Sequence, residues 1–368
     1  MPVKWKAGML NRRYFIFSGG AVLTPWPVRA AGAGNDSVAA SLAQAMADNH
    51  GYPSAGMVAG LCDGRGQQIV TSGDADNGRA LDGDTVFDIG SISKLFTALA
   101  LADMVARGQM AMQDPLAKYL PAAVRVPQFG GKPISLLDLA TYSPGLPGWP
   151  ADMPALSEKP FPDYSVDRLY RALSQVKLAA APGSKYVYSN FGYGLLGLAL
   201  ARHAGMDFES LIVSRICKPL GMESTRIVPT PQMRARVTPG HFKSLDKTAS
   251  WNMPPAFAAA GAFRSTANDL LKFLAAAMGP SPLAPAFAEM MKTQRPADNP
   301  DTKVAAGWFI TNGHDDKLIW KDGGVLGYSS FLGYSATRNS GVVVLANGNS
   351  GVLNLGKHLL NAEFPLHG

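Results

Sequence analysis

Hydrophobic and polar residues alternate in a pattern that divides the chain into sheet-forming ends and a helical middle. Near the start, apolar residues recur at helical spacing and predict a helix over residues 36–50. The apolar runs 56–61 and 68–72 flank Asp-Gly-Arg-Gly, which predicts a β-hairpin. A third extended segment is expected at residues 85–88. The N-terminal part therefore contributes strands.

The middle of the chain, from residue 91 to about residue 250, has mostly helical patterning interrupted by Pro and Gly. Helices are expected at residues 92–107, 135–141, 166–175, 191–203 and 208–217. This stretch predicts a helical subdomain.

The C-terminal third returns to strands. Residues 265–269 read Ser-Thr-Ala-Asn-Asp, a capping start for a helix at 270–278. Beyond it, the pattern predicts strands at 306–310, 317–320, 328–334 and 341–346, and then a helix at 352–360. Strands at both ends predict an α+β fold, with one antiparallel sheet built from the N- and C-terminal segments and flanked by helices.

Residues 1–33 have the features of an export signal. A basic start precedes an apolar run from Phe15 to Val28, which two prolines interrupt, so the run is too short and broken for a stable membrane span. Small residues allow cleavage near Ala30 or Ala33. The segment Asn-Arg-Arg-Tyr-Phe-Ile at 11–16 is similar to a twin-arginine signal, although an ordinary secretory signal with two unrelated arginines is the alternative. Either signal predicts a mature chain that works in the bacterial periplasm.

The mature chain, residues 34–368, is expected to form a single domain. Its α/β part comprises residues 34–90 and 255–368, and its helical part comprises residues 91–254. A chain with 47% hydrophobic and 17% charged residues is ordinary globular material.

Charge and metal-binding residues exclude several function classes. Residues 1–30 carry five cations and no acid, so without them the formal net charge falls from +7 to +2. This small charge excludes the strongly basic surface that is typical of a nucleic-acid-binding protein. The six histidines have no ligand-like spacing, and we expect no metal site and no cofactor. Cys62 and Cys217 are the two cysteines; an oxidising compartment permits a disulfide, but two buried free thiols are the favoured interpretation. The sequence does not define the oligomeric state.

A Ser-x-x-Lys motif in an unusual setting is the first candidate for chemistry. The motif occurs three times, at Ser91/Lys94, Ser174/Lys177 and Ser244/Lys247. Only Ser91 opens a long apolar helix, in which Lys94 is the sole cation from residue 92 to residue 106. Lys94 is therefore expected to be desolvated, which lowers the pKa of a lysine.

Two interpretations of this first motif remain open from the residues alone. Three-residue spacing places Lys94 beside Ser91 on one helical face, where a lysine with a lowered pKa could accept the seryl proton. In the other interpretation, Ser91 is an ordinary N-cap and Lys94 extends its ammonium to solvent.

Two further segments carry polar residues in suggestive surroundings. Tyr188-Ser189-Asn190 precedes an apolar helix; a phenol can relay a proton, and an Asn amide can orient a substrate carbonyl or the lysine. A core tyrosine and an N-cap asparagine are the structural alternatives. Lys321-Asp322-Gly323 begins a glycine-rich strand, along which a substrate could bind against the edge and a backbone N–H could act as an oxyanion donor. A strand-end lysine beside a turn is the alternative.

In this order, the three segments resemble the penicillin-recognising serine hydrolases, specifically the class C β-lactamase branch with its D-Ala-D-Ala peptidase and class-C-like esterase relatives. The resemblance covers nearly all of the mature chain. It extends to Leu-Leu-Asp-Leu-Ala-Thr-Tyr-Ser at 136–143, Ala-Gly-Trp at 306–308 and Val-Leu-Ala-Asn at 344–347.

The resemblance implies a role for each matching residue. Ser91 would be the acylated nucleophile, and Lys94 and Tyr188 would handle its proton in acylation and activate the water for deacylation. Asn190 would hold the substrate amide, and Lys321 would attract a substrate carboxylate and tune Tyr188. The N–H groups of Ser91 and Gly324 would form the oxyanion hole.

The chain departs from this family at the third motif and at the rim of the site. The family usually has Thr or Ser where Asp322 stands, so a carboxylate-bearing substrate would be repelled if Asp322 faces the site. The alternative is that Asp322 points away and pairs with a neighbouring cation. Only residues 312–316 separate two strands where class C β-lactamases have a longer insert, and Trp149 stands near a position where they commonly have glutamine. These differences favour the peptidase and esterase relatives.

The sequence therefore predicts a periplasmic serine hydrolase that forms an acyl-enzyme on Ser91. The first expected substrate is a β-lactam amide, followed closely by a D-Ala-D-Ala peptide of peptidoglycan and then by a short ester. A slowly deacylating penicillin or peptidoglycan sensor is the non-enzymatic alternative, which the intact Ser91, Lys94 and Tyr188 disfavour.

Overall fold

The structure is a computed structural model that describes residues 55–154, 164–242, 246–248, 252–348 and 351–366, together with residues 40, 41 and 44. The predicted export signal and most of the predicted helix at 36–50 lie outside the described residues. Both therefore remain predictions.

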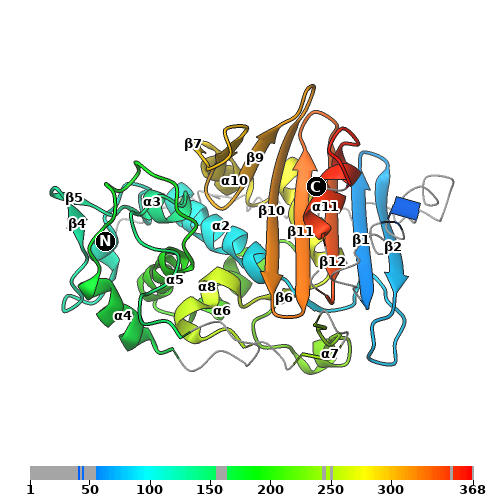
Figure 1. Ribbon diagram of the computed structural model, residues 1–368, viewed down its shortest axis with the longest axis horizontal. Helices are drawn as coiled ribbons and strands as arrows, with labels where there is room; N and C mark the ends of the chain where they lie inside the picture. Colours follow the sequence, from blue (N-terminus) through cyan, green and yellow to red (C-terminus); the bar gives the residue numbers. More distant parts are fainter. Residues whose placement is uncertain are drawn as a thin grey trace, which may run out of the picture.

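An eight-stranded sheet forms one half of the fold (Figure 1). All of its neighbouring strands pair antiparallel. Across the sheet the strands are β2 (Gly66–Gly73), β1 (Gly56–Asp63), β12 (Ser340–Ala346), β11 (Tyr328–Ser335), β10 (Lys317–Val325), β9 (Phe309–Asn312), β8 (Thr302–Val304) and β7 (Arg295–Pro296). Because β1 pairs with β12, one sheet joins the N- and C-terminal segments, and the predicted α+β architecture is confirmed.

The central strands β11 and β12 are buried almost throughout because helices cover both faces of the sheet. Every residue of β11 is buried, as are all residues of β12 after Ser340. On one face lies α11 (Val352–Leu360), and on the other lies α9 (Ala267–Met278) (Figure 1). A strand buried on both faces has no need of alternating polar residues.

The helical half packs around α2 (Ser93–Ala106), a helix whose residues from Ser93 to Met104 are all buried. The other helices are α3 (Leu136–Ala140), α4 (Val166–Gln175), α5 (Asn190–Ala204), α6 (Phe208–Ile212) with its π-helical continuation Val213–Cys217, α7 (Pro231–Arg234), α8 (Ala258–Gly261) and α10 (Ala284–Met291). Short 3₁₀ turns are formed by Gly90–Ile92, Leu116–Tyr119 and Pro255–Phe257. Because α2 packs against both α5 and α10, it joins the helical half to the segment that leads into the sheet.

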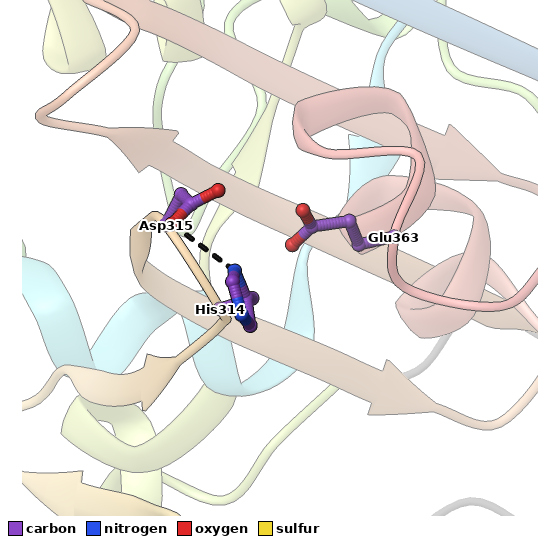
Figure 2. A group of neighbouring side chains, drawn as sticks. All are labelled: His314, Asp315 and Glu363. Atoms are coloured by element: carbon purple, nitrogen blue, oxygen red, sulfur yellow. Dashed lines mark ion pairs between the residues drawn. The ribbon is translucent and has the colours of Figure 1, made fainter.

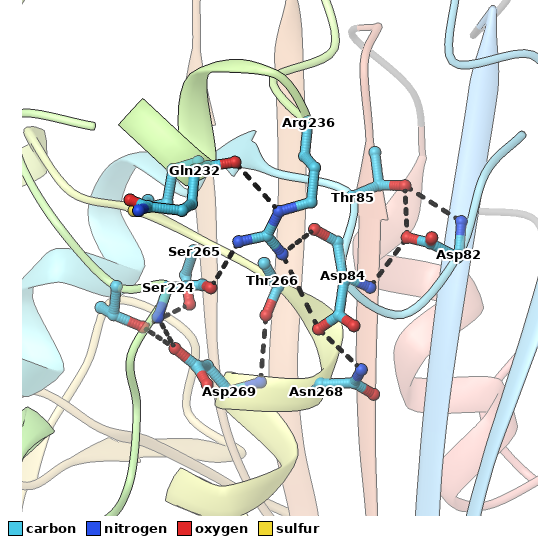
Figure 3. A network of polar contacts seen from close by, with 12 residues as sticks. Asp82, Asp84, Thr85, Ser224, Gln232, Arg236, Ser265, Thr266, Asn268 and Asp269 are labelled. Carbon is cyan, nitrogen blue, oxygen red and sulfur yellow. Dashed lines mark hydrogen bonds and ion pairs between the residues drawn. The ribbon is translucent and has the colours of Figure 1, made fainter. Parts of the chain in front are cut away.

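Polar contacts hold the start of α9 against the segment that precedes the 3₁₀ turn Gly90–Ile92. Thr266 caps α9 by accepting a hydrogen bond from the Asp269 N–H at 3.2 Å, which confirms the predicted capping start (Figure 3). The Asp269 carboxylate accepts hydrogen bonds from the Ser224 N–H and the Thr225 hydroxyl. Asn268, in the first turn of α9, donates to the Asp84 carboxylate at 2.9 Å, so the start of α9 and the chain entering β3 (Phe87–Asp88) are held together.

The structure corrects two predictions and adds elements that were not predicted. The extended segment 85–88 yields only β3, which pairs with β6 (Arg264–Ser265) outside the main sheet, while a further small hairpin joins β4 (Gln128–Phe129) to β5 (Lys132–Pro133). The strand predicted at 306–310 begins only at Phe309, because the chain turns at Gly307, whose φ is +80°. The sequence analysis missed α10, β7 and β8.

The two cysteines are buried and free, as expected. Burial raises the pKa of each thiol to about 12, so neither is a thiolate near neutral pH. Among the helices in the described ranges, none has the length and apolar character needed to cross a membrane.

Candidate active site

Ser91 lies in the 3₁₀ turn Gly90–Ile92 that leads directly into α2. This turn packs against β10 so closely that glycine is required on both sides. At Gly90, where φ is +48°, a Cβ would lie 2.9 Å from the backbone nitrogen of Gly324. At Gly323, a Cβ would lie 2.2 Å from the carbonyl oxygen of Ile89. The two glycines therefore let the turn that carries Ser91 lie directly beside the strand that carries Lys321.

Lys94 is fully buried beneath Ser91. Its Nζ lies 3.0 Å from Ser91 Oγ, 2.7 Å from Asn190 Oδ1 and 2.7 Å from the carbonyl oxygen of Ala260. Two of these three partners only accept hydrogen bonds, whereas the Ser91 hydroxyl can also donate. When the Lys94 amine is neutral, its two N–H groups can donate to Asn190 Oδ1 and to the Ala260 carbonyl. Its lone pair then points at the Ser91 hydroxyl.

The electrostatic setting of Lys94 destabilises its charged form and lowers its pKa. Burial lowers the pKa of Lys94, and the nearby charge of Lys321 acts in the same direction, against the opposing effect of Tyr188. The interpretation in which Lys94 extends to solvent is therefore wrong. The predicted desolvation of Lys94 is confirmed, and its role as a proton acceptor remains a prediction.

Tyr188 lies between the two lysines. Its ring centroid is 4.8 Å from Lys94 Nζ and 5.2 Å from Lys321 Nζ. Burial alone would raise the pKa of Tyr188, but the charges of Lys321 and Lys94 outweigh it and hold the pKa below the ordinary value for tyrosine. Contacts with Lys94 and Ser91 act in the same direction. The phenol and the amine therefore influence each other's titration next to Ser91, and their role in proton transfer remains a prediction.

Asn190 is the first residue of α5, and Ser189 caps that helix by accepting a hydrogen bond from the Gly192 N–H at 2.9 Å. The alternative in which Asn190 is the N-cap is therefore wrong. Asn190 instead orients Lys94 through its Oδ1. Its expected contact with a substrate amide remains a prediction.

Tyr142 forms a rigid support behind Tyr188, which the sequence analysis did not foresee. Its ring stacks on Tyr188 with centroids 5.0 Å apart and on Phe309 with centroids 5.7 Å apart, and its hydroxyl donates to the Gly307 carbonyl at 3.1 Å. Tyr142 is completely buried and has a φ of +54°, a strained conformation for a non-glycine residue. The packing that overcomes this strain also fixes the position of the Tyr188 ring.

Replacing Tyr142 should reveal this support. Tyr142→Phe keeps the stacking and loses one hydrogen bond, so we expect a loss of about 1 kcal/mol in unfolding free energy and nearly unchanged kinetics. Tyr142→Ala leaves a cavity, and we expect a loss of about 3–5 kcal/mol and a kcat that falls more than KM changes. Denaturant unfolding and steady-state kinetics at a temperature where both variants are folded test this; equal kcat values for the two variants would rule out the positioning role.

Lys321 and Asp322 form an ion pair at one end of the site. Lys321 Nζ donates to Asp322 Oδ1 at 2.9 Å and to the Asp322 carbonyl oxygen at 2.7 Å. The side chain of Lys321 is 2% exposed, whereas that of Asp322 is 43% exposed. The sequence left open whether Asp322 faces the site or pairs with a cation, and the structure shows that it does both.

Part of β10 presents a free edge to the site. In the described chain, β9 pairs with β10 only from Lys317 to Trp320, whereas β11 continues beside β10 as far as Val325. The backbone from Lys321 to Val325 is therefore open on the side of β9, where an extended substrate could add as a further strand.

One open pocket of about 340 Å³ joins these features. It is lined by Ser91, Tyr188, Phe309, Lys321, Asp322, Gly323 and Gly324. Of the residues predicted from sequence, only Lys94 and Asn190 lie outside this lining, and both lie behind it in contact with each other. The sequence analysis missed Phe309, Tyr142 and the Ala260 carbonyl; Tyr142 stands in a segment that carried the family resemblance, which was the one available signal.

A separate surface cluster brings together His314, Asp315 and Glu363, whose ligand atoms all lie within 4.8 Å of one another (Figure 2). All three residues are exposed, and His314 Nδ1 lies 3.1 Å from Asp315 Oδ1. None of them lines the pocket of Ser91. The cluster therefore has no part in chemistry at Ser91, and the expectation of no metal site remains a prediction.

Comparison with known proteins agrees with this geometry. Residues 39–362 match the family model described as Beta-lactamase. The chain is 34% identical over 194 residues to the D-alanyl-D-alanine-carboxypeptidase/endopeptidase AmpH of Escherichia coli, an alignment that covers 51% of this chain and 49% of AmpH, so the match spans about half of that relative. It is 29% identical over 308 residues to a Beta-lactamase of Pseudomonas fluorescens, covering 74% of this chain and 82% of the relative. The crystal structure of a Beta-lactamase/D-alanine Carboxypeptidase from Yersinia pestis superimposes with a TM-score of 0.75 at 25% identity, covering 90% of this chain and 99% of that one.

Proposed function

Because the chain belongs to the Beta-lactamase family of serine hydrolases, we propose that it cleaves an acyl compound through an ester formed on Ser91. The observation that carries the proposal is the 3.0 Å contact between Ser91 Oγ and the fully buried Lys94 Nζ. A serine hydroxyl is a weak nucleophile until a neighbouring base takes its proton. A desolvated lysine beside a tyrosine of lowered pKa supplies that base.

The reaction has two halves. Ser91 Oγ attacks the acyl carbon while its proton passes to Lys94 and Tyr188, and the same pair returns the proton to the leaving amine or alcohol as the scissile bond breaks. A water molecule then attacks the ester, gives its proton to the pair, and releases the acid and Ser91. The N–H groups of Ser91 and Gly324 stabilise the negative oxygen in both halves, since Gly90 and Gly323 bring their two segments together.

The family match supports a β-lactam amide as the first substrate to test. The match to AmpH supports a D-Ala-D-Ala amide as the second. A short ester is the third, and the exposed carboxylate of Asp322 in the pocket supports it. We also propose that the predicted signal exports the chain to the periplasm, where peptidoglycan peptides and β-lactams are met.

Three assays on the purified mature protein test the function. These are turnover of a chromogenic cephalosporin, release of D-Ala from a muropeptide and hydrolysis of p-nitrophenyl butyrate. We expect steady turnover, beyond one equivalent per enzyme, in at least one of them. A burst equal to the enzyme concentration followed by silence in every assay would contradict the proposal and would identify a slowly deacylating sensor.

A further inference from the structure

At Lys321 and Asp322, the pocket that contains Ser91 presents a carboxylate rather than an ammonium. Lys321 is 2% exposed, and its Nζ donates twice to Asp322, once to the side chain and once to the carbonyl. The Asp322 side chain is 43% exposed and lines the pocket. Of these two residues, Asp322 therefore presents its charge to the pocket and Lys321 does not.

Two aromatic rings lie close to the buried ammonium of Lys321. Its Nζ lies 5.2 Å from the ring centroid of Tyr188 and 4.9 Å from that of Phe309. The Lys321 pKa is raised although burial opposes this, because Asp322 and Tyr188 favour the charged form; Lys321 also holds the Asp322 pKa low against burial. The pair therefore consists of a cation and an anion that neutralise each other.

Neither of the other nearby lysines adds an exposed positive charge to the lining of the pocket. Lys94 is completely buried, and its Nζ is held by Ser91, Asn190 and Ala260. Lys357 lies on α11 with its Nζ 4.1 Å from the ring centroid of Trp320, and it does not line the pocket. Among the seven lining residues, Asp322 supplies the exposed charge.

We propose that Asp322 sets the substrate preference of this site, favouring esters and amides that are uncharged beside Lys321 over those that carry a carboxylate there. This inference rests on the proposed acyl-enzyme function and ranks uncharged esters ahead of carboxylate-bearing substrates in kcat/KM. The exposed carboxylate of Asp322 repels an anion that binds near it. Lys321 does not offset that repulsion, because its ammonium is buried and already donates to Asp322.

A matched pair of esters tests the proposal. The probes are 3-carbamoylphenyl butyrate and 3-carboxyphenyl butyrate, which share shape and acyl group and differ in one charge. The measured quantity is the ratio of kcat/KM for the neutral ester to that for the anionic ester. Two variants remove the charge. Asp322→Asn retains an oxygen that can accept a hydrogen bond from Lys321, and Asp322→Thr has a smaller side chain. If one variant fails to fold, the other still tests the proposal. The control is Asp315→Asn, which removes a carboxylate of 78% side-chain exposure outside the pocket.

We expect the wild-type protein and Asp315→Asn to favour the neutral ester, and the ratio to fall at least about tenfold in either Asp322 variant. An unchanged ratio in both Asp322 variants, or a wild-type preference for the anionic ester, would overturn the proposal while Ser91-dependent hydrolysis continued. If the wild-type protein hydrolysed neither ester but turned over the cephalosporin or the muropeptide, this inference would fail and the proposed function would stand. Absence of turnover in all of these assays would contradict the proposed function as well.

Discussion

Replacing Ser91 with alanine is expected to abolish covalent labelling of the protein by a fluorescent penicillin and by an uncharged fluorophosphonate. Hydrolysis of the best substrate should fall by a factor on the order of 10⁴ or more, because no acyl-enzyme can form without the hydroxyl. The fold should remain, since Ser91 lies in a short turn at the pocket and alanine fits its backbone. Gel fluorescence and steady-state kinetics measure the two effects.

The chain offers a matched control for this variant. Ser174 belongs to a second Ser-x-x-Lys pair, with Lys177, but its hydroxyl donates to the Tyr170 carbonyl at 3.0 Å in the last turn of α4. Ser174→Ala should therefore keep full labelling and turnover. Labelling that survives in Ser91→Ala at another serine would contradict the assignment of the nucleophile.

The choice among the three Ser-x-x-Lys pairs could be made from the sequence because desolvation is a local property of a helix. A lysine surrounded on every face by apolar residues has to be buried, and Lys94 is buried completely. Lys177, by contrast, is exposed just beyond the end of α4, and the third pair lies partly outside the described residues. The helices at 166–175 and 352–360 were predicted to the residue, since both have clear apolar stripes and definite ends.

Other features could not be predicted because they depend on contacts between distant segments. The Ala260 carbonyl that accepts from Lys94 is 166 residues away in sequence, and nothing in the local pattern indicates it. The rings that stack on Tyr142, those of Tyr188 and Phe309, are also distant from it in sequence. The pairing of β3 with β6 likewise includes the buried ion pair between Asp88 and Arg264, at 2.6 Å.

The orientation of Asp322 shows the same limit. A strand pattern indicates that successive side chains alternate, but it does not say how far a lysine bends toward its neighbour. Here Lys321 curls back to the Asp322 carboxylate and carbonyl, so two consecutive residues on opposite faces of a strand meet at the free edge of β10. The same strand edge thus carries both the expected lysine and the anion that neutralises it.

Replacing Lys94 with methionine should have the second-largest effect. Methionine fills a similar volume without a base, so acylation should slow by about 10²–10⁴-fold. Asn190 Oδ1 and the Ala260 carbonyl lose their donor, at a cost of about 1–3 kcal/mol for each buried group, while the desolvation cost of the amine disappears. Because these stability terms oppose each other, the activity loss should far exceed any change in the melting temperature, which a thermal scan measures alongside the kinetics.

The pH dependence of the residual activity separates a proton acceptor from a merely structural lysine. In the wild-type protein, the deprotonated pair is the reactive form, so the acylation rate should rise with pH and level off above an apparent pKa that belongs to Lys94 and Tyr188 together. That pKa should lie below the ordinary values of both groups, since both are lowered. In Lys94→Met, Tyr188 loses one of the two cations that lower its pKa, so the rising limb should move to higher pH. Lys177→Met, in the exposed pair, should keep the wild-type profile, and an unmoved limb in Lys94→Met would show that Lys94 does not handle the seryl proton.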